Sequence, residues 1–276
     1  MKSYKGPFAV VTTLFFMWGF ITVLVDGLIP RLKETFELTY AQAGLVQWAW
    51  FLAYLCFSIP AGFIIAKTGY KKGIFIGLAV AGLGCMTFYP AAETRIFFLF
   101  LLALFVVAGG ITILQVAANP YVTALGDTTK ASSRLNLAQA FNPLGSLLGM
   151  FVASKFILAA LESDKQRNGV GELIFSSLDE TTKAAIRTND LIIIRNPYVV
   201  LGLFVLIMLI AIAIVKIPTS TKNKITNPIA SIKWLVKNKN YREGVLAQVF
   251  YVAAQIMCWT FIIQYAENLG IDKATA

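Results

Sequence analysis

Long runs of apolar residues recur along this 276-residue chain, and they constrain its fold more than any other feature. A helix needs about 20 apolar residues to cross the hydrocarbon core of a bilayer, and only helices and closed barrels can span it. The chain is 58% hydrophobic and 14% charged, whereas soluble domains are roughly 45–50% apolar and about 25% charged. We therefore predict an all-α, polytopic membrane helix bundle. The predicted spans are residues 7–29, 41–66, 73–92, 95–120, 134–160, 196–217 and 244–266.

Prolines lie at the boundaries of several predicted spans. A proline lacks a backbone N–H and clashes with the preceding turn, so it tends to end a helix or to stand at its beginning. We expect Pro30, Pro90 and the pair Asn119-Pro120 to end the first, third and fourth spans, and Asn196-Pro197 to begin the sixth.

The fifth span contains both a proline and a pair of spaced glycines. Pro143 is expected to kink this helix. Gly145 and Gly149 form a G-x-x-x-G pattern with Ser146 beside the first glycine, a pattern that lets helix backbones approach closely. We predict that this face packs against a neighbouring helix.

The distribution of basic residues predicts the orientation of the bundle. If the N-terminus is cytoplasmic, lysine and arginine concentrate in the cytoplasmic segments, whereas the two short outside loops hold only Arg31, Lys33 and Arg95. Cytoplasmic loops of membrane proteins show this excess of positive charge. We predict a six-helix transmembrane domain over 1–217, a basic cytoplasmic linker over 218–243, and the first helix of an incomplete C-terminal half over 244–276.

The composition argues against several other functions. There is no histidine, and Cys56, Cys85 and Cys258 all lie within apolar runs, which argues against a metal site, a histidine-dependent active site and a disulfide framework. The net charge of +10 comes from loops between the spans, so we expect no nucleic-acid partner. Only one carboxylate lies within the first six apolar runs, which is too few for an acid–base pair. We therefore expect no enzyme activity and no catalytic residue.

Asp26 is that carboxylate, at the end of the first span. Trp18, Thr22 and Asp26 are spaced four residues apart and therefore share one face of a helix. Ionisable residues at membrane depth usually face the bundle interior or a water-filled path. A desolvated carboxylate binds and releases a proton readily, and it could hold a cation instead. The alternative is that Asp26 is a hydrated residue at the membrane boundary.

Amides recur at helical spacing in the remaining spans. Amide groups suit sugar hydroxyls and aromatic rings suit the apolar face of a sugar, although such residues also form hydrogen bonds between helices. Gln47 in the second span and Gln139 in the fifth would occupy corresponding places in an inverted repeat. We predict a polar cavity for a small-molecule sugar, lined by Gln47, Gln115, Asn119, Asn136, Gln139, Asn142, Tyr251, Gln255 and Trp259.

Several short runs resemble a known transporter family. The glycine-bounded basic loop over 62–73 lies where the major facilitator superfamily has its cytoplasmic signature, with Ala66 in place of the usual acidic residue. More specific runs resemble the fucose–galactose–glucose symporter family. They are DGLIP at 26–30, AQAGLVQ at 41–47, AANPYVT at 117–123, RLNLAQAFN at 134–142, VLAQ at 245–248 and YVAAQ at 251–255.

The resemblance implies a major facilitator fold of about twelve helices, of which this chain would cover the six-helix N-terminal half and the seventh helix. It implies that Asp26 couples transport to a cation, a proton or sodium, with no further cofactor, and that Gln139 contacts the sugar. The fucose symporter has a glutamate at the position of Gln115, so the resemblance favours glucose or galactose as the substrate.

The resemblance further implies a multi-pass protein of the bacterial inner membrane, in contact with the lipid bilayer, and we expect a monomer. We expect the chain alone to be inactive. The alternatives are a fucose or N-acetylhexosamine symporter, or a membrane sugar sensor that transports nothing.

Overall fold

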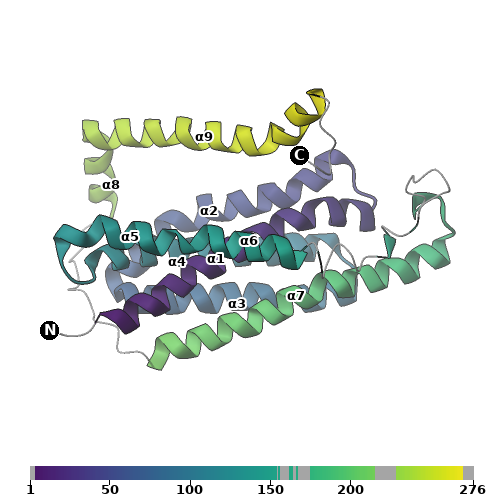
Figure 1. Cartoon of the computed structure of the whole chain (residues 1–276), viewed down its shortest axis with the longest axis horizontal. Coiled ribbons are helices and arrows are strands. Elements are labelled where there is room, and N and C mark those ends of the chain that lie inside the picture. Colours follow the sequence, from purple (N-terminus) through teal and green to yellow (C-terminus); the bar gives the residue numbers. More distant parts are fainter. Residues whose placement is uncertain are drawn as a thin grey trace. The chain divides into compact units, whose positions relative to one another are not determined.

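The computed structural model describes residues 4–153, 155, 162–163, 166, 175–214 and 228–269. Within these ranges, only the backbone is described for some residues. They are 5, 26–31, 34, 40, 176, 228–229, 232, 256 and 259–268. Regular secondary structure in the described ranges is helical (Figure 1). The chain divides into two compact units, Met1–Lys224 and Ile225–Ala276, and each is considered by itself.

The first unit is a bundle of long helices. Five helices in the described residues are long and apolar enough to cross a membrane, which confirms the predicted fold class. The elements of this unit are α1 (Lys5–Thr35), α2 (Tyr40–Thr68), α3 (Tyr70–Thr94), α4 (Phe97–Ala124), the 3-10 turn η1 (Thr128–Lys130), α5 (Ala131–Gln139), α6 (Phe141–Val152), the 3-10 turn η5 (Phe175–Ser177) and α7 (Glu180–Ile214).

The second unit contains α8 (Pro228–Lys237) and α9 (Lys239–Asn268). Helix α8 lies inside the stretch predicted as a basic linker. Helix α9 contains the seventh predicted span, 244–266, whose passage through the membrane stays a prediction. The predicted division of the chain at 217 and 243 likewise stays a prediction.

Up to Val152, the fifth predicted span consists of two helices joined end to end. Helix α5 has 9 residues and α6 has 12, and Ala140 between them keeps right-handed helical dihedral angles. The Ala140 N–H still donates to the Asn136 carbonyl, at 2.9 Å. Pro143 has no N–H to offer the carbonyl four residues before it, at Gln139, and the break at Ala140 lies in the turn before the proline. The expected kink stays a prediction.

The predicted ends of three spans were wrong by about one helical turn. Helix α1 continues past Pro30 to Thr35, α3 past Pro90 to Thr94, and α4 past Pro120 to Ala124. A proline within a helix removes only its own hydrogen bond to the carbonyl four residues earlier and leaves later donors intact, so the helix can continue beyond it. Threonine hydroxyls in the last turn add hydrogen bonds to the prolines' own carbonyls. The Thr94 hydroxyl donates to the Pro90 carbonyl at 2.8 Å, and the Thr123 hydroxyl to the Pro120 carbonyl at 2.8 Å.

The predicted beginning of the sixth span was also wrong. Helix α7 starts at Glu180, and Pro197 lies inside it. Charged residues of this extension form ion pairs with distant segments. Lys183 Nζ lies 3.2 Å from Glu37 in the α1–α2 connection, and Arg195 pairs with Glu93 of α3 at 2.8 Å. These long-range partners stabilise a helical extension that local sequence did not indicate.

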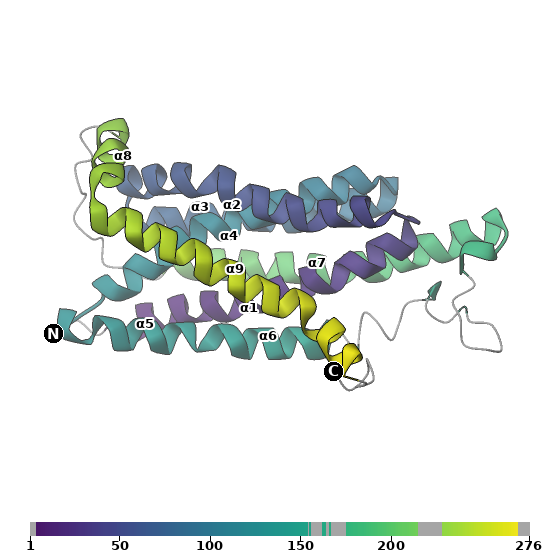
Figure 2. The ribbon, with the colours of Figure 1, turned by 90° about the horizontal axis from the view of Figure 1, so that it is seen from above.

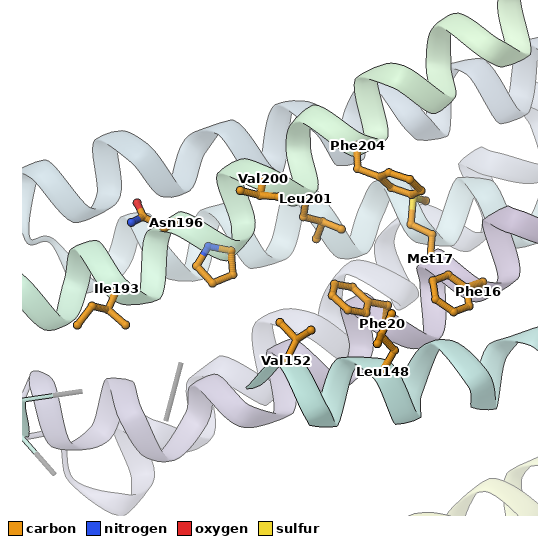
Figure 3. Close-up of a pocket in the computed structure, with 11 residues that line it drawn as sticks. Phe16, Met17, Phe20, Leu148, Val152, Ile193, Asn196, Val200, Leu201 and Phe204 are labelled. Atoms are coloured by element: carbon orange, nitrogen blue, oxygen red, sulfur yellow. The ribbon is translucent and has the colours of Figure 1, made fainter. Parts of the chain in front are cut away.

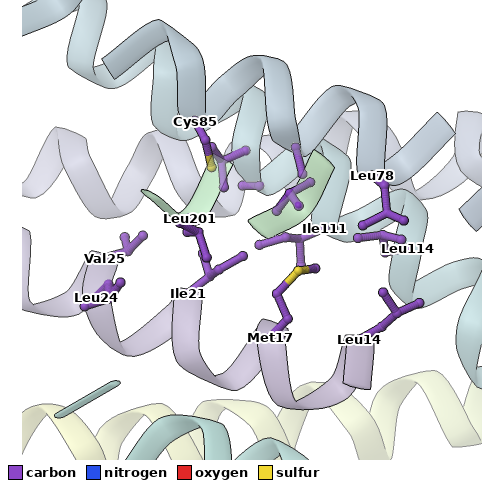
Figure 4. Close-up of a cluster of buried hydrophobic side chains, with 14 of the residues drawn as sticks. Leu14, Met17, Ile21, Leu24, Val25, Leu78, Cys85, Ile111, Leu114 and Leu201 are labelled. Carbon is purple, nitrogen blue, oxygen red and sulfur yellow. The ribbon is translucent and has the colours of Figure 1, made fainter. Parts of the chain in front are cut away.

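The hydrophobic core lies where α1 meets α3, α4 and α7. Figure 4 shows side chains from these helices converging, with the α1 residues facing the others. Helix α3 packs along α4 and α7, α2 packs along α4, and α1 packs along α6 (Figure 2). The labelled core residues are Leu14, Met17, Ile21, Leu24, Val25, Leu78, Cys85, Ile111, Leu114 and Leu201. This packing fixes the position of α1 relative to α4.

Glycines bring α1 and α6 into backbone contact. A Cβ added at Gly145 would lie 1.9 Å from the Phe16 carbonyl oxygen, and one at Gly19 would lie 2.0 Å from the Asn142 carbonyl oxygen. The Ser146 hydroxyl donates to the Gly19 carbonyl at 3.3 Å. The predicted close packing at Gly145 and Gly149 is confirmed. The contact leaves no space for a larger residue at these positions.

Candidate functional site

A hydrogen bond between α2 and α4 forms the centre of the candidate site. The Gln115 amide Nε2 donates to the Tyr54 hydroxyl at 2.8 Å, and both side chains are half-buried. Gln115 is one of the predicted sugar-binding residues. Because its amide nitrogen is held by Tyr54, its amide oxygen remains on the other side of the group as a hydrogen-bond acceptor.

Asn119 lies one turn further along α4. Its Nδ2 donates to the Gln115 carbonyl at 3.0 Å, whereas its Oδ1 is buried without a protein partner. A buried polar atom without a partner is costly, and such atoms usually bind water or a ligand. The amide therefore presents a second acceptor beside that of Gln115.

Trp18 of α1 completes the cluster. It lines a small cavity together with Gln115. The cavity volume is about 10 Å³, which is room for roughly one water molecule. We call Trp18, Tyr54, Gln115 and Asn119 the amide–aromatic cluster. A hexose cannot enter this cavity, so a sugar would contact only the accessible side of these groups.

Asp26 follows Trp18 by two helical turns on α1. The helix is continuous from Trp18 to Asp26, and the Thr22 hydroxyl between them donates to the Trp18 carbonyl at 3.0 Å. Eight residues of helix correspond to about 12 Å along the axis. The side chain of Asp26 lies outside the described residues, so its coupling role stays a prediction.

The remaining predicted residues of the first unit divide into two groups. Gln47, Asn136 and Gln139 are exposed on α2 and α5. Asn142 is half-buried, and its Nδ2 points to the Phe15 carbonyl of α1 at a long 3.4 Å. Asn142 therefore supports the contact between α1 and α6, whereas the three exposed amides remain accessible.

The predicted residues of the second unit all lie on α9. Tyr251 is exposed and Gln255 is half-buried. The side chain of Trp259 lies outside the described residues. Their part in a sugar site stays a prediction.

Sequence reasoning missed Tyr54 as a member of the site. Its neighbours along the chain are apolar, so it resembled an ordinary core aromatic. A signal was nevertheless present, because Gln47, Trp50 and Tyr54 are spaced three and four residues apart and share one helical face. In the structure the Trp50 and Tyr54 rings lie 6.2 Å apart.

Sequence reasoning also missed Asp190, which is fully buried in α7. Its carboxylate oxygens accept the backbone N–H groups of Glu162 at 2.8 Å and Ser163 at 3.1 Å. The residue anchors part of the connection between α6 and α7. We assign it a structural role.

A larger pocket lies elsewhere, between α1, α6 and α7. Its volume is about 600 Å³, and its walls are apolar except for Asn196 (Figure 3). Phe16 and Phe20 of α1 face Leu201 and Phe204 of α7 across it. A sugar needs several hydrogen-bond partners, so this apolar pocket is unsuited to bind one.

The arrangement of spanning helices agrees with comparisons to known proteins. Residues 8–276 match the family model of the Major Facilitator Superfamily. The chain belongs to the major facilitator superfamily. This superfamily consists of transporters, and the bundle of apolar helices is accordingly an integral membrane structure.

Individual sugar transporters of the superfamily are similar over nearly the whole chain. The L-fucose-proton symporter of Haemophilus influenzae is 44% identical over 276 residues, which cover 99% of this chain and 64% of the relative. The glucose/galactose transporter of Brucella abortus biovar 1 is 40% identical over 270 residues, covering 97% of this chain and 60% of the relative.

A crystal structure of the E. coli fucose:proton symporter FucP has the same fold. It superposes with a TM-score of 0.81 at 33% sequence identity, covering 96% of this chain and 63% of that one. The chain thus spans about three fifths of the length of the relatives it matches. The resemblance to sugar symporters that the sequence motifs indicated is confirmed.

Proposed function

We propose that this chain provides the sugar-binding and cation-coupling half of a secondary transporter that moves a hexose, such as glucose or galactose, by alternating access. The single observation that supports this most is the Gln115–Tyr54 hydrogen bond inside the bundle. It holds an amide in a fixed orientation at membrane depth, where unpaired polar groups are costly.

The amide–aromatic cluster has the chemistry that a sugar requires. The Gln115 oxygen is an acceptor for a sugar hydroxyl, and the Trp18 ring offers an apolar surface. Sites for small polar ligands combine mostly apolar walls with a few fixed polar groups. The exposed amides of Asn136 and Gln139 would add further hydrogen bonds from α5.

The cluster supplies only one wall of a site. Its cavity holds about one water molecule, so a bound hexose would need a second surface opposite it. In transporters built from repeated helical units, the substrate lies between two such units, and rocking of one against the other alternates access. Tyr251, Gln255 and Trp259 of α9 are our candidates for the opposing surface.

Coupling would depend on Asp26. Gln115 cannot ionise, so within the predicted site Asp26 is the group able to bind a proton or to hold sodium. The relatives are named as a fucose–proton symporter and a glucose/galactose transporter. We propose the bacterial inner membrane as the location, with a cytoplasmic N-terminus and a monomeric protein.

Uptake of labelled glucose, galactose and L-fucose tests this function. Cells expressing the complete transporter that contains this chain are compared with cells expressing its Gln115→Ala variant. We expect accumulation of glucose or galactose against its gradient, with at least about a tenfold rise in KM in the variant, since an amide that hydrogen-bonds a substrate contributes about 1.5 kcal/mol or more.

A matched control is Thr87→Ala in α3. The Thr87 hydroxyl bonds only to the Leu83 carbonyl of its own helix, at 2.9 Å, so uptake should be unchanged. Sugar binding without any accumulation in proteoliposomes would support the sugar-sensor alternative instead. Absence of both uptake and binding for all three sugars would refute the proposal.

A further inference from the structure

Helix α8 is joined to α9 through a defined corner. Only Asn238 separates the two helices. The Asn238 N–H donates to the Trp234 carbonyl at 3.1 Å and so closes α8, while its Oδ1 accepts the Tyr241 N–H at 3.3 Å and caps α9. Figure 1 shows α8 running across the axis of α9 rather than continuing it.

One side of α8 presents two lysines and a tryptophan. Lys233, Trp234 and Lys237 lie on the same side of the helix because they are spaced one, three and four residues apart. All three side chains are exposed, and Trp234 is 65% exposed. A large exposed tryptophan between two lysines is typical of a surface that meets lipid headgroups.

The corner places this surface at the edge of the bilayer. The apolar part of α9 begins at about residue 244, and the five helical residues before it rise roughly 8 Å. If α9 crosses the membrane along its normal, α8 must lie in the membrane plane at headgroup level. This step depends on α9 spanning the bilayer, as expected of the superfamily, and not on the proposed sugar site.

The charge of this region matches an anionic surface. From Pro228 to Glu243 the sequence contains Lys233, Lys237, Lys239 and Arg242, against the single acid Glu243. Lys239 lies 3.6 Å from Glu243, both being exposed. The positive-inside rule explains why lysines occur here, but it requires neither a helix set across α9 nor an exposed tryptophan beside them.

We propose that α8 is an interfacial helix that binds the headgroups of anionic phospholipids through Lys233 and Lys237, with Trp234 seated among the headgroups. The contact would fix the corner between α8 and α9 and make the position of α9 sensitive to the charge of the membrane. A lysine near an anionic bilayer contributes about fivefold to binding, so the pair should contribute about 30-fold.

Hydrogen–deuterium exchange of the full chain in nanodiscs tests the proposal. Protection of the 228–237 peptide is measured in discs of phosphatidylcholine alone and in discs containing phosphatidylglycerol. We expect slower exchange of this peptide in the anionic discs, by up to about 30-fold, and loss of the difference in the double variant Lys233→Gln, Lys237→Gln. The matched control is Lys67→Gln, Lys72→Gln, which removes two exposed lysines elsewhere and should keep the difference.

The result that overturns the proposal is exchange of 228–237 that is independent of lipid charge. Retention of the lipid effect in the α8 double variant would overturn it too. Peptides of α3 and α4 report whether a variant has folded. If the double variant does not fold, exchange of the 228–237 peptide of the parent protein is measured in anionic discs at high salt. Salt screens the headgroup charge, so protection caused by that charge should be lost. Salt-resistant protection would instead indicate contact with protein.

Discussion

Replacing Gly145 with alanine should force α1 and α6 apart. The added Cβ would lie 1.9 Å from the Phe16 carbonyl oxygen, 2.8 Å from its carbon and 3.0 Å from the Phe20 nitrogen. Ordinary van der Waals contact begins at 3.4 Å, so one helix must move by about 1.5 Å. All three atoms belong to the helix backbone, so no side-chain rotation can relieve the clash.

The expected loss of stability is about 2–4 kcal/mol. Overpacking a close interface costs roughly 1–3 kcal/mol. The same movement weakens the bonds from Ser146 to the Gly19 carbonyl and from Asn142 to the Phe15 carbonyl, each worth about 0.5–1.5 kcal/mol at best. Since these two bonds are long, we take the lower end of that range for each.

The assay is thermal unfolding of the purified chain in detergent. A loss of this size should lower the melting temperature by about 5–15 °C. The matched control is Gly62→Ala in α2, where an added Cβ meets nothing within 4 Å, and where a helical alanine should be neutral or stabilising by up to about 1 kcal/mol. Equal melting temperatures for the two variants would refute the backbone contact between α1 and α6.

Three further predictions address charged groups. Asp26→Asn should abolish gradient-driven sugar accumulation while leaving sugar exchange across the membrane, as measured by counterflow; unchanged accumulation would remove Asp26 from the coupling role. Asp190→Ala should destabilise the protein by about 3 kcal/mol, because the buried N–H of Ser163 and the half-buried N–H of Glu162 lose their acceptor; a melting temperature equal to the parent's would contradict this. The hydrogen bond from the Thr129 N–H lowers the pKa of Asp127, so its stabilising contribution is present at neutral pH and is lost as the pH falls through about 4 and below. The difference in melting temperature between the parent and Asp127→Asn should therefore be larger at pH 7 than at pH 3, and a constant difference would contradict the assignment.

The spanning helices could be predicted because lipid imposes one simple requirement. Each span must be apolar over about 20 residues, and this pattern is visible in a single sequence. Helix ends were harder to place. Pro90 and Pro120 predict helix ends, but the helices continue for another turn, because each proline removes only one hydrogen bond and the donors after it stay in place. The extension of α7 depends on Glu37 and Glu93, which are far away in sequence, so local pattern gave no signal for it.

The candidate site was predicted in part. Helical spacing placed Gln115 and Asn119 on one face of α4, and the structure brings them together with Trp18 from α1. The same spacing puts Tyr54 on one face with Gln47 and Trp50, but a tyrosine inside an apolar run resembles a core residue until its hydroxyl partner is known. Spacing also could not separate Asn142, which turns to the α1 backbone, from Asn136 and Gln139, which are exposed. These distinctions depend on how α1, α4 and α6 pack.

Equilibrium binding of glucose and galactose to the purified protein tests the central claim most directly. Titration calorimetry would compare the parent with Tyr54→Phe, which removes only the hydroxyl that holds Gln115, and with the control Thr87→Ala. We predict that Tyr54→Phe raises the sugar Kd about 5- to 10-fold, because one oriented hydrogen bond is lost at about 1 kcal/mol or slightly more, while the control binds like the parent. Identical Kd values for all three proteins would show that the amide–aromatic cluster does not bind the sugar.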